Sequence, residues 1–166
     1  MMYKNLPQLD ELDRKILRQL LQDARTPFLE IARECNVSGA TVHLRMQKLE
    51  KIGVIQGSRL IVDYRKLGLG LCAFVGLYLD KGSHFDVILE QLKLLPEVVE
   101  CHYATGNYAI FLKVYCLNPE HLRDLLIDKI QKIENIRRTE TFISLEQSIN
   151  RVPDLDMMLN DGETEE

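Results

Sequence analysis

The segment that most narrows the possible folds is VSGATVHLRMQKLEKIGVI, residues 37–55. Ser38 suits a helix N-cap and Gly53 a left-handed C-cap, so the segment predicts a helix between these two residues. Three apolar side chains share a narrow arc of that helix and are expected to face a core: Val42, Met46 and Leu49. The first turn holds only small or hydroxylated side chains, so its outer surface is left open to a close approach.

Two shorter helices are predicted before this one. LDELDRKILRQLLQDAR has Asp10 as N-cap, Asp13 at the capping-box position and an apolar stripe along one face. TPFLEIARECN has Thr26 as N-cap and Pro27 at the first helical position.

A β-hairpin is predicted after the third helix. It covers VIQGSRLIVDY and turns at Gln56-Gly57-Ser58-Arg59. Three short helices followed by a hairpin is the pattern of a winged helix-turn-helix domain. In such a domain, the N-terminal part of the second helix of the pair enters the major groove of DNA.

The predicted third helix carries side chains that suit DNA. Small residues let the backbone approach, hydroxyl groups donate to phosphates and cations neutralise them. An exposed Leu44 suits a thymine methyl group. The expected DNA-binding residues are Ser38, Gly39, Ala40, Thr41, His43, Leu44, Arg45, Gln47, Lys48 and Arg59. The alternative is that the hydroxyls only cap the helix and that the cations form a solvated face.

The charge distribution favours the first interpretation weakly. Residues 1–65 hold 11 Lys/Arg against 8 Asp/Glu, a charge of +3, whereas the rest holds 10 against 17, a charge of -7. The basic part is therefore the candidate for a polyanionic partner.

The second half alternates strands and helices. After a linker at 65–70, the expected elements are a strand at 71–79, a helix at 83–95, strands at 97–106 and 107–116, a helix at 118–133 and a strand at 137–145. In that helix of 83–95, Ser83 is the expected N-cap. This order is that of a ferredoxin-like βαββαβ sheet domain, so the whole chain is expected to be α+β.

Two of these strands, 71–79 and 107–116, are apolar on both faces. Helices in this fold cover only one face of the sheet. The other face must pack on something, and the simplest partner is the same face of a second copy. We therefore expect a dimer at least.

The turn ATGNYA, residues 104–109, presents backbone N–H groups, a hydroxyl and an amide. Such groups suit the carboxylate and amine of a small polar ligand. The alternative is a plain Gly-Asn hairpin turn with no ligand.

In this order, the motifs LDELDRKIL, SGATVHLRMQKLEKIGVIQG and ATGNYAIFLKVY resemble the Lrp/AsnC family, the feast/famine transcriptional regulators, over roughly residues 8–150. The resemblance implies DNA binding by a winged helix-turn-helix domain at 1–64 and sensing of an amino acid or related metabolite by a domain at 71–149. It also implies double-stranded operator DNA as partner and homodimers that often assemble into octamers. A cytoplasmic location is expected from the cysteines, which are widely spaced and form no CxxC pair.

The family's turn commonly reads TGDYD, whereas this chain has Asn107 and Ala109 at the two acidic positions. An amide supplies no charge for a ligand's amino group, so binding of a zwitterionic amino acid is expected to be weaker. The expected effector-binding residues are Thr105, Gly106, Asn107, Tyr108, Thr139, Thr141 and Ser144.

Two other functions fit the sequence less well. A small ferredoxin-like enzyme would need a nucleophile or an acid–base pair, and the spacing of the four histidines places none, so no catalytic residue is expected. A metabolite-sensing or interaction module without DNA binding would lack the small and basic residues of the third helix.

Four widely spaced cysteines within apolar segments are expected to be reduced, with no metal and no cofactor. No apolar run suits a membrane span. Residues 150–166 are expected to form a tail that is acidic and disordered at its end.

Overall fold

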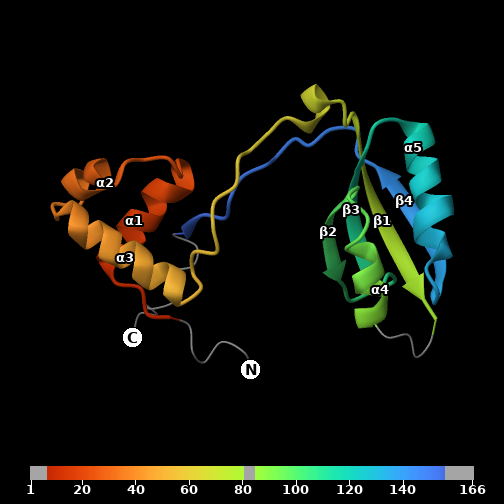
Figure 1. Ribbon diagram of the computed structural model, residues 1–166, viewed down its shortest axis with the longest axis horizontal. Coiled ribbons are helices and arrows are strands. Elements are labelled where there is room, and N and C mark those ends of the chain that lie inside the picture. The colour runs from red at the N-terminus through yellow and green to blue at the C-terminus, as the bar shows by residue number, and fades with distance from the viewer. Residues whose placement is uncertain (1–6, 81–84, 156–166) are drawn as a thin grey trace, which may run out of the picture. The chain divides into compact units, whose positions relative to one another are not determined.

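The computed structural model describes residues 7–80 and 85–155 (Figure 1). These residues form two compact units, one made by 7–60 with 150–155 and the other by 61–149. The expected cap at Ser83 and the end of the acidic tail lie outside the described residues.

The first unit is a three-helix domain. Its helices are α1 (Glu11–Gln22), α2 (Phe28–Glu34) and α3 (Gly39–Lys51). Their inward faces meet in a small core, in which Ile16, Ile31 and Val42 are fully buried. Met46 packs against this core and Leu49 is also fully buried, so the apolar arc predicted for the third helix is confirmed.

Most of the predicted helix ends are confirmed. Asp10 and Asp13 form a complete capping box on α1, Ser38 caps α3, and Gly53 takes the left-handed conformation after α3 with φ of 77°. The cap predicted for α2 is wrong by one residue. Pro27 is the N-cap, and the hydroxyl of Thr26 instead donates to the carbonyl of Asp23 at 2.8 Å.

The hairpin predicted after α3 is wrong. Residues 54–63 contain no strand and lead to η1, a 3₁₀ turn at Tyr64–Leu67. The N–H groups of Val54 and Ile55 both donate to the carbonyl of Leu49, at 3.0 and 3.2 Å. Because these N–H groups cap the end of α3, they are not available for hydrogen bonds between strands. A lone two-stranded hairpin is also only marginally stable in water. The described part of the chain therefore has a helix-turn-helix without a wing.

The second unit is a four-stranded antiparallel sheet in the order β2-β3-β1-β4 (Figure 1). Its elements are β1 (Leu71–Leu79), α4 (Phe85–Leu92), β2 (Val98–Tyr103), β3 (Ile110–Cys116), α5 (Pro119–Asp124) and β4 (Ile136–Ile143). The predicted βαββαβ order and the α+β class are confirmed.

The last helix departs from a regular α-helix. Asn118, the first residue of the helix predicted at 118–133, caps α5 by accepting from the N–H of His121 at 2.8 Å. The helix then continues as a π turn, η2 (Leu125–Lys129), and a 3₁₀ turn, η3 (Ile130–Lys132). A π turn adds a residue to the helical repeat. Along this segment, Leu122, Leu125, Ile130 and Ile133 are buried, and Leu126 packs partly buried against the same core.

The sheet has one face under helices and one without them. In register, Ala73 faces Val114, Val75 faces Leu112 and Leu77 faces Ile110, and all six side chains are fully buried with those of α4 and α5. The residues between them point the opposite way. We call this second surface the open face; it is formed by Phe74, Gly76, Tyr78, Phe111, Lys113, Tyr115, Glu140 and Phe142.

Candidate functional site

The start of α3 is organised by two hydroxyl groups. The Ser38 Oγ accepts from the N–H of Thr41 at 3.0 Å and lies 2.8 Å from the Thr41 Oγ1. Both groups remain near the surface, beside the free N–H groups of the first turn. A helix N-terminus of this kind attracts anions such as phosphate.

Gly39 has a packing role that its sequence position did not reveal. A Cβ on Gly39 would come to 3.0 Å from the Cδ2 of Leu29 in α2. Gly39 thus leaves room for the tip of the exposed Leu29 side chain, in addition to leaving the outer surface open.

The outward arc of α3 lies opposite the buried Val42 and Leu49. Ala40, Leu44, Gln47, Lys48 and Lys51 are all exposed, with Leu44 64% exposed. His43 lies beside them, its Nε2 3.2 Å from the Nε2 of Gln47. An apolar side chain this open in the middle of a polar face suits an apolar contact with a partner, such as a thymine methyl group.

Two predicted phosphate ligands are engaged inside the protein. The Lys48 Nζ donates to the Asp13 Oδ2 at 2.6 Å, and the Arg45 Nη1 donates to the Asp13 Oδ1 at 3.1 Å. Arg45 also bonds to Asp10. The Asp13 side chain is fully buried, whereas those of Lys48 and Arg45 are 42% and 30% exposed. We call Asp10, Asp13, Arg45 and Lys48 the α1–α3 ion cluster.

This cluster joins α1 to α3 through charged groups in addition to their apolar contacts. Breaking a buried ion pair by removing one partner costs about 3–5 kcal/mol, because the other charge stays buried. The Asp13 N–H bond and the Arg45 guanidinium hold the pKa of Asp10 below its usual value, and Asp10 and Asp13 raise the pKa of Arg45. The capping role predicted for Asp13 is right, but nothing in a helical spacing shows that it also meets Arg45.

Arg59, the remaining predicted phosphate ligand, is exposed in the strand-free segment after α3. It therefore lies on a segment without regular secondary structure and not on a hairpin.

The expected effector residues lie in three places. Thr105, Gly106 and Asn107 are exposed in the turn between β2 and β3, where Gly106 has φ of 112°. Tyr108 follows them, and its ring lies on the open face above Gly76.

The three β4 residues of that set lie elsewhere. Thr139 pairs with Leu77 and Thr141 with Val75, so both are on the helix-covered face, and the Thr139 Oγ1 accepts from Gln131 at 2.9 Å. Ser144 pairs with Cys72 at the far end of the sheet, through its N–H at 2.9 Å. A single chain thus does not gather these residues around one ligand.

A cavity of about 500 Å³ is found at that far end. It combines apolar and aromatic walls with charged groups of both signs, among them Tyr64, Arg65, Lys113 and Glu146. Ser144 is the one expected effector residue on its lining.

Comparisons with known proteins agree with this two-part architecture. The sequence profile of the AsnC-type helix-turn-helix domain matches residues 9–50, and that of the Lrp/AsnC ligand binding domain matches residues 72–153. The regulatory protein AsnC of Haemophilus influenzae is 44% identical over 143 residues, which are 86% of this chain and 95% of that protein. The chain belongs to the Lrp/AsnC family. The AsnC of Escherichia coli strain K12 is 41% identical over 143 residues, 86% of this chain and 94% of that protein.

Solved structures of two transcriptional regulators share the fold. The structure of E. coli AsnC has a TM-score of 0.83 at 40% identity and covers 88% of this chain and 98% of its own. A transcriptional regulator of Neisseria meningitidis in complex with L-Met has a TM-score of 0.85 at 20% identity and covers 91% of this chain and 99% of its own. This chain is accordingly a transcriptional regulator with a helix-turn-helix DNA-binding domain and a ligand-binding domain.

The four cysteines are free, and burial raises the pKa of the Cys116 thiol to about 11, which makes it a poor nucleophile. Among residues 7–80 and 85–155, no helix is long and apolar enough to cross a membrane.

Proposed function

We propose that this Lrp/AsnC regulator binds operator DNA by placing the outward arc of α3 in the major groove. The observation that carries the proposal is the composition of that arc. Ala40, Leu44 and Gln47 are exposed together, on a helix whose other side is fixed in a core. Gln47 has the bidentate amide that suits adenine, and Leu44 the apolar group that suits thymine.

The surrounding residues are assigned to the DNA backbone. Ser38 and Thr41 lie at the N-terminus of α3, where a phosphate is favoured by both hydroxyl and helix dipole. His43 flanks the arc, and Arg59 is exposed on the segment that follows. Gly39 and Ala40 leave room for the DNA backbone to approach.

We further propose that two copies pair through the open face. Phe74 and Phe111 stack there with ring centroids 5.8 Å apart, and Phe142 remains 44% exposed. An apolar surface of this kind on a sheet is normally covered. Pairing through one face gives a two-fold dimer, which reads a roughly palindromic operator with half-sites about one or more helical turns apart. Assembly of such dimers into octamers is the family's expected arrangement.

The effector is proposed to be an amino acid or a close relative that contacts the turn at Thr105–Tyr108. This turn offers exposed N–H and amide groups, which suit a carboxylate. Residues of one chain leave the site incomplete, so the remaining contacts are assigned to a second copy. The N. meningitidis protein in complex with L-Met has this fold, so the fold accommodates an amino-acid ligand.

The test is a binding titration with the DNA upstream of the chain's own gene and with a scrambled duplex of equal length. Each is measured at two salt concentrations, with and without a mixture of the twenty amino acids. We expect tighter binding to the upstream fragment, weakening with salt, and a change with the mixture. Equal binding to both duplexes, or none to either, would contradict the proposal and leave a ligand-sensing module without operator recognition.

A further inference from the structure

We propose that Asp13 is the positioning residue of the DNA-reading helix, and that Arg45 and Lys48 hold this helix instead of neutralising DNA phosphates. The inference rests on the proposed function. It changes the roles of the two cations that a helical wheel assigns to DNA.

The geometry of the α1–α3 ion cluster carries this assignment. Each oxygen of the Asp13 carboxylate takes one cation, Oδ2 from Lys48 at 2.6 Å and Oδ1 from Arg45 at 3.1 Å. The carboxylate is fully buried, and its Oδ2 also accepts the N–H of Asp10 at 3.4 Å. Arg45 and Lys48 lie three residues apart on α3, on adjoining positions of one helix face.

Two bonds from neighbouring positions of α3 to one carboxylate of α1 fix both the rotation and the axial position of α3. Ala40, Leu44 and Gln47 are then presented to the groove in one register. A misplacement of about one ångström is enough to lose a bidentate contact to a base edge, so this register bears on specificity.

The charge balance of the cluster opposes a second role on DNA. Asp10 and Asp13 carry two negative charges and Arg45 and Lys48 two positive ones, so the cluster is neutral as a whole. A phosphate that drew Lys48 away would leave a buried carboxylate short of a partner. That loss outweighs a single bond to a solvated phosphate, because charges out of water are costly to separate and exposed pairs add little stability.

Phosphate neutralisation is then left to exposed cations. Lys51 lies three residues beyond Lys48 on α3, is exposed and has no ion pair within the part of the chain that the structure describes. Lys48 and Lys51 can therefore be compared directly, because both are lysines on α3. Lys48 is paired with Asp13, whereas Lys51 has no ion pair among the described residues.

The experiment measures the affinity for the upstream duplex from 50 to 300 mM salt, in the full-length chain and its variants. The slope of log affinity against log salt changes by about 0.9 for each phosphate that the protein neutralises. The variants are Lys48→Gln, Lys51→Gln, Asp13→Asn and the double variant Asp13→Asn/Lys48→Gln. The ratio of affinities for the upstream and scrambled duplexes and the melting temperature are recorded for each.

We expect Lys48→Gln to keep the wild-type slope and Lys51→Gln to flatten it by about 0.9. Asp13→Asn frees Lys48 and leaves Arg45 paired with Asp10 alone. Its slope therefore steepens, its affinity for scrambled DNA rises and its preference for the upstream duplex falls. In the double variant Asp13→Asn/Lys48→Gln, the slope is expected to be shallower than in Asp13→Asn by about 0.9.

A flatter slope in Lys48→Gln alone would overturn the inference, since it would show that Lys48 binds a phosphate in the wild type. An Asp13→Asn variant that only melts earlier, with slope and preference unchanged, would also overturn it. Should Asp13→Asn fail to fold, the comparison of Lys48→Gln with Lys51→Gln still decides. The proposed function fails separately, if the wild-type chain does not prefer the upstream duplex.

Discussion

The ring of Tyr108 lies directly on the backbone of Gly76 in the middle of the sheet. A Cβ on Gly76 would come within 2.5 Å of the Tyr108 Cδ1. The same ring packs edge-on against Tyr78 with centroids 5.2 Å apart, and it also contacts Phe111 and Phe142. Tyr108 belongs to the turn that is proposed to contact the effector, and its ring lies on the open face. The contact between this ring and Gly76 therefore connects the turn to the open face.

Gly76→Ala is expected to expel the Tyr108 ring and disrupt the aromatic cluster of the open face. Overpacking of this kind costs about 1–3 kcal/mol, and the displaced ring should weaken dimerisation. Sedimentation equilibrium measures the dimer dissociation constant. Gly70→Ala is the control, because the nearest atom to its Cβ is the Leu117 carbonyl oxygen at an ordinary 3.7 Å. A Gly76→Ala chain that associates as tightly as Gly70→Ala would refute pairing through this face.

Substitutions at Ser38 separate helix capping from DNA binding. Ser38→Ala removes the bond to the Thr41 N–H, and loss of an N-cap costs about 1 kcal/mol of unfolding free energy. Ser38→Asp keeps the cap and adds a charge that favours the helix dipole but repels phosphate. We expect Ser38→Asp to match the wild-type stability in urea yet bind the upstream duplex more than tenfold more weakly. If Ser38→Asp bound the upstream duplex with wild-type affinity, no DNA phosphate would lie at the N-terminus of α3.

Asn107 supplies an uncharged amide where the family's turn commonly has a carboxylate. Asn107→Asp adds a charged acceptor for a ligand's amino group, and charge-assisted bonds are about twice as strong as neutral ones. We expect about tenfold tighter binding of the amino acid that the mixture experiment identifies, a gain of about 1.4 kcal/mol. Titration calorimetry measures it, with Asn118→Asp as the control because Asn118 caps α5 outside this turn. Unchanged affinity would remove Asn107 from the effector contact.

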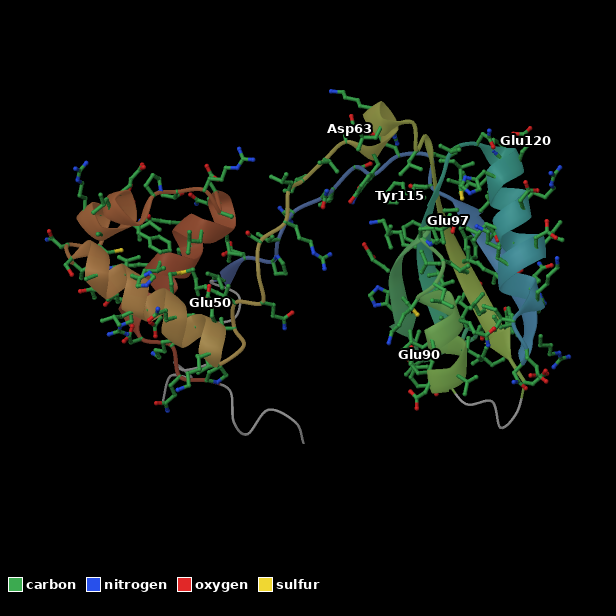
Figure 2. All side chains as sticks on the ribbon, viewed as in Figure 1. Glu50, Asp63, Glu90, Glu97, Tyr115 and Glu120 are labelled. Atoms are coloured by element: carbon green, nitrogen blue, oxygen red, sulfur yellow. The ribbon has the colours of Figure 1, made fainter. Side chains whose placement is uncertain are left out.

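A second ion cluster ties the start of β2 to the last helix. Glu97, which is labelled in Figure 2, is buried. Its Oε1 accepts from the Lys129 Nζ at 2.5 Å and lies 3.1 Å from the His121 Nε2. Burial raises the pKa of Glu97, but hydrogen bonds from Lys129, its own backbone N–H and His121 outweigh burial, so the net pKa lies below the usual 4.5. A lowered folded pKa means that stability is full above the unfolded pKa and falls as pH drops through the folded pKa.

The free energy of unfolding is therefore expected to decrease as the pH falls below about 4.5, because the unfolded chain then takes up a proton at Glu97 first. Glu97→Gln should remove part of that slope and cost about 1–3 kcal/mol at pH 7, through lost hydrogen bonds at a buried group. Urea unfolding between pH 3.5 and 7 measures both. Glu90→Gln, at an exposed glutamate paired with Lys93, is the matched control. Parallel pH profiles for the two variants would contradict this account of Glu97.

Local patterns predict the elements well where a side chain acts on its own helix or strand. Ser38, Gly53 and Asn118 each act on backbone groups within a few residues, so their roles follow from sequence spacing. The strand at 71–79 has the predicted bounds, and its two apolar faces match the covered face and the open face of the sheet.

Features that depend on contacts between distant residues do not follow from local patterns. Asp13 and Lys48 are 35 residues apart, and no spacing rule connects a capping residue with a cation on another helix. Alternating apolar residues predict a hairpin after α3, but Val54 and Ile55 donate to the end of that helix instead. The π turn at Leu125–Lys129 also leaves no local signal, because the apolar positions on either side of it, Leu122 and Ile130, are both buried.

The most direct test of the account is the ratio of affinities for the upstream and scrambled duplexes in Gln47→Ala and Leu44→Ala. Both side chains are exposed on α3, so the substitutions should leave the melting temperature within a few degrees of the wild type. If α3 reads bases, either variant loses about 1–3 kcal/mol of preference for the upstream duplex, while its affinity for scrambled DNA and its salt slope are unchanged. A wild-type preference in both variants would show that another surface reads the operator.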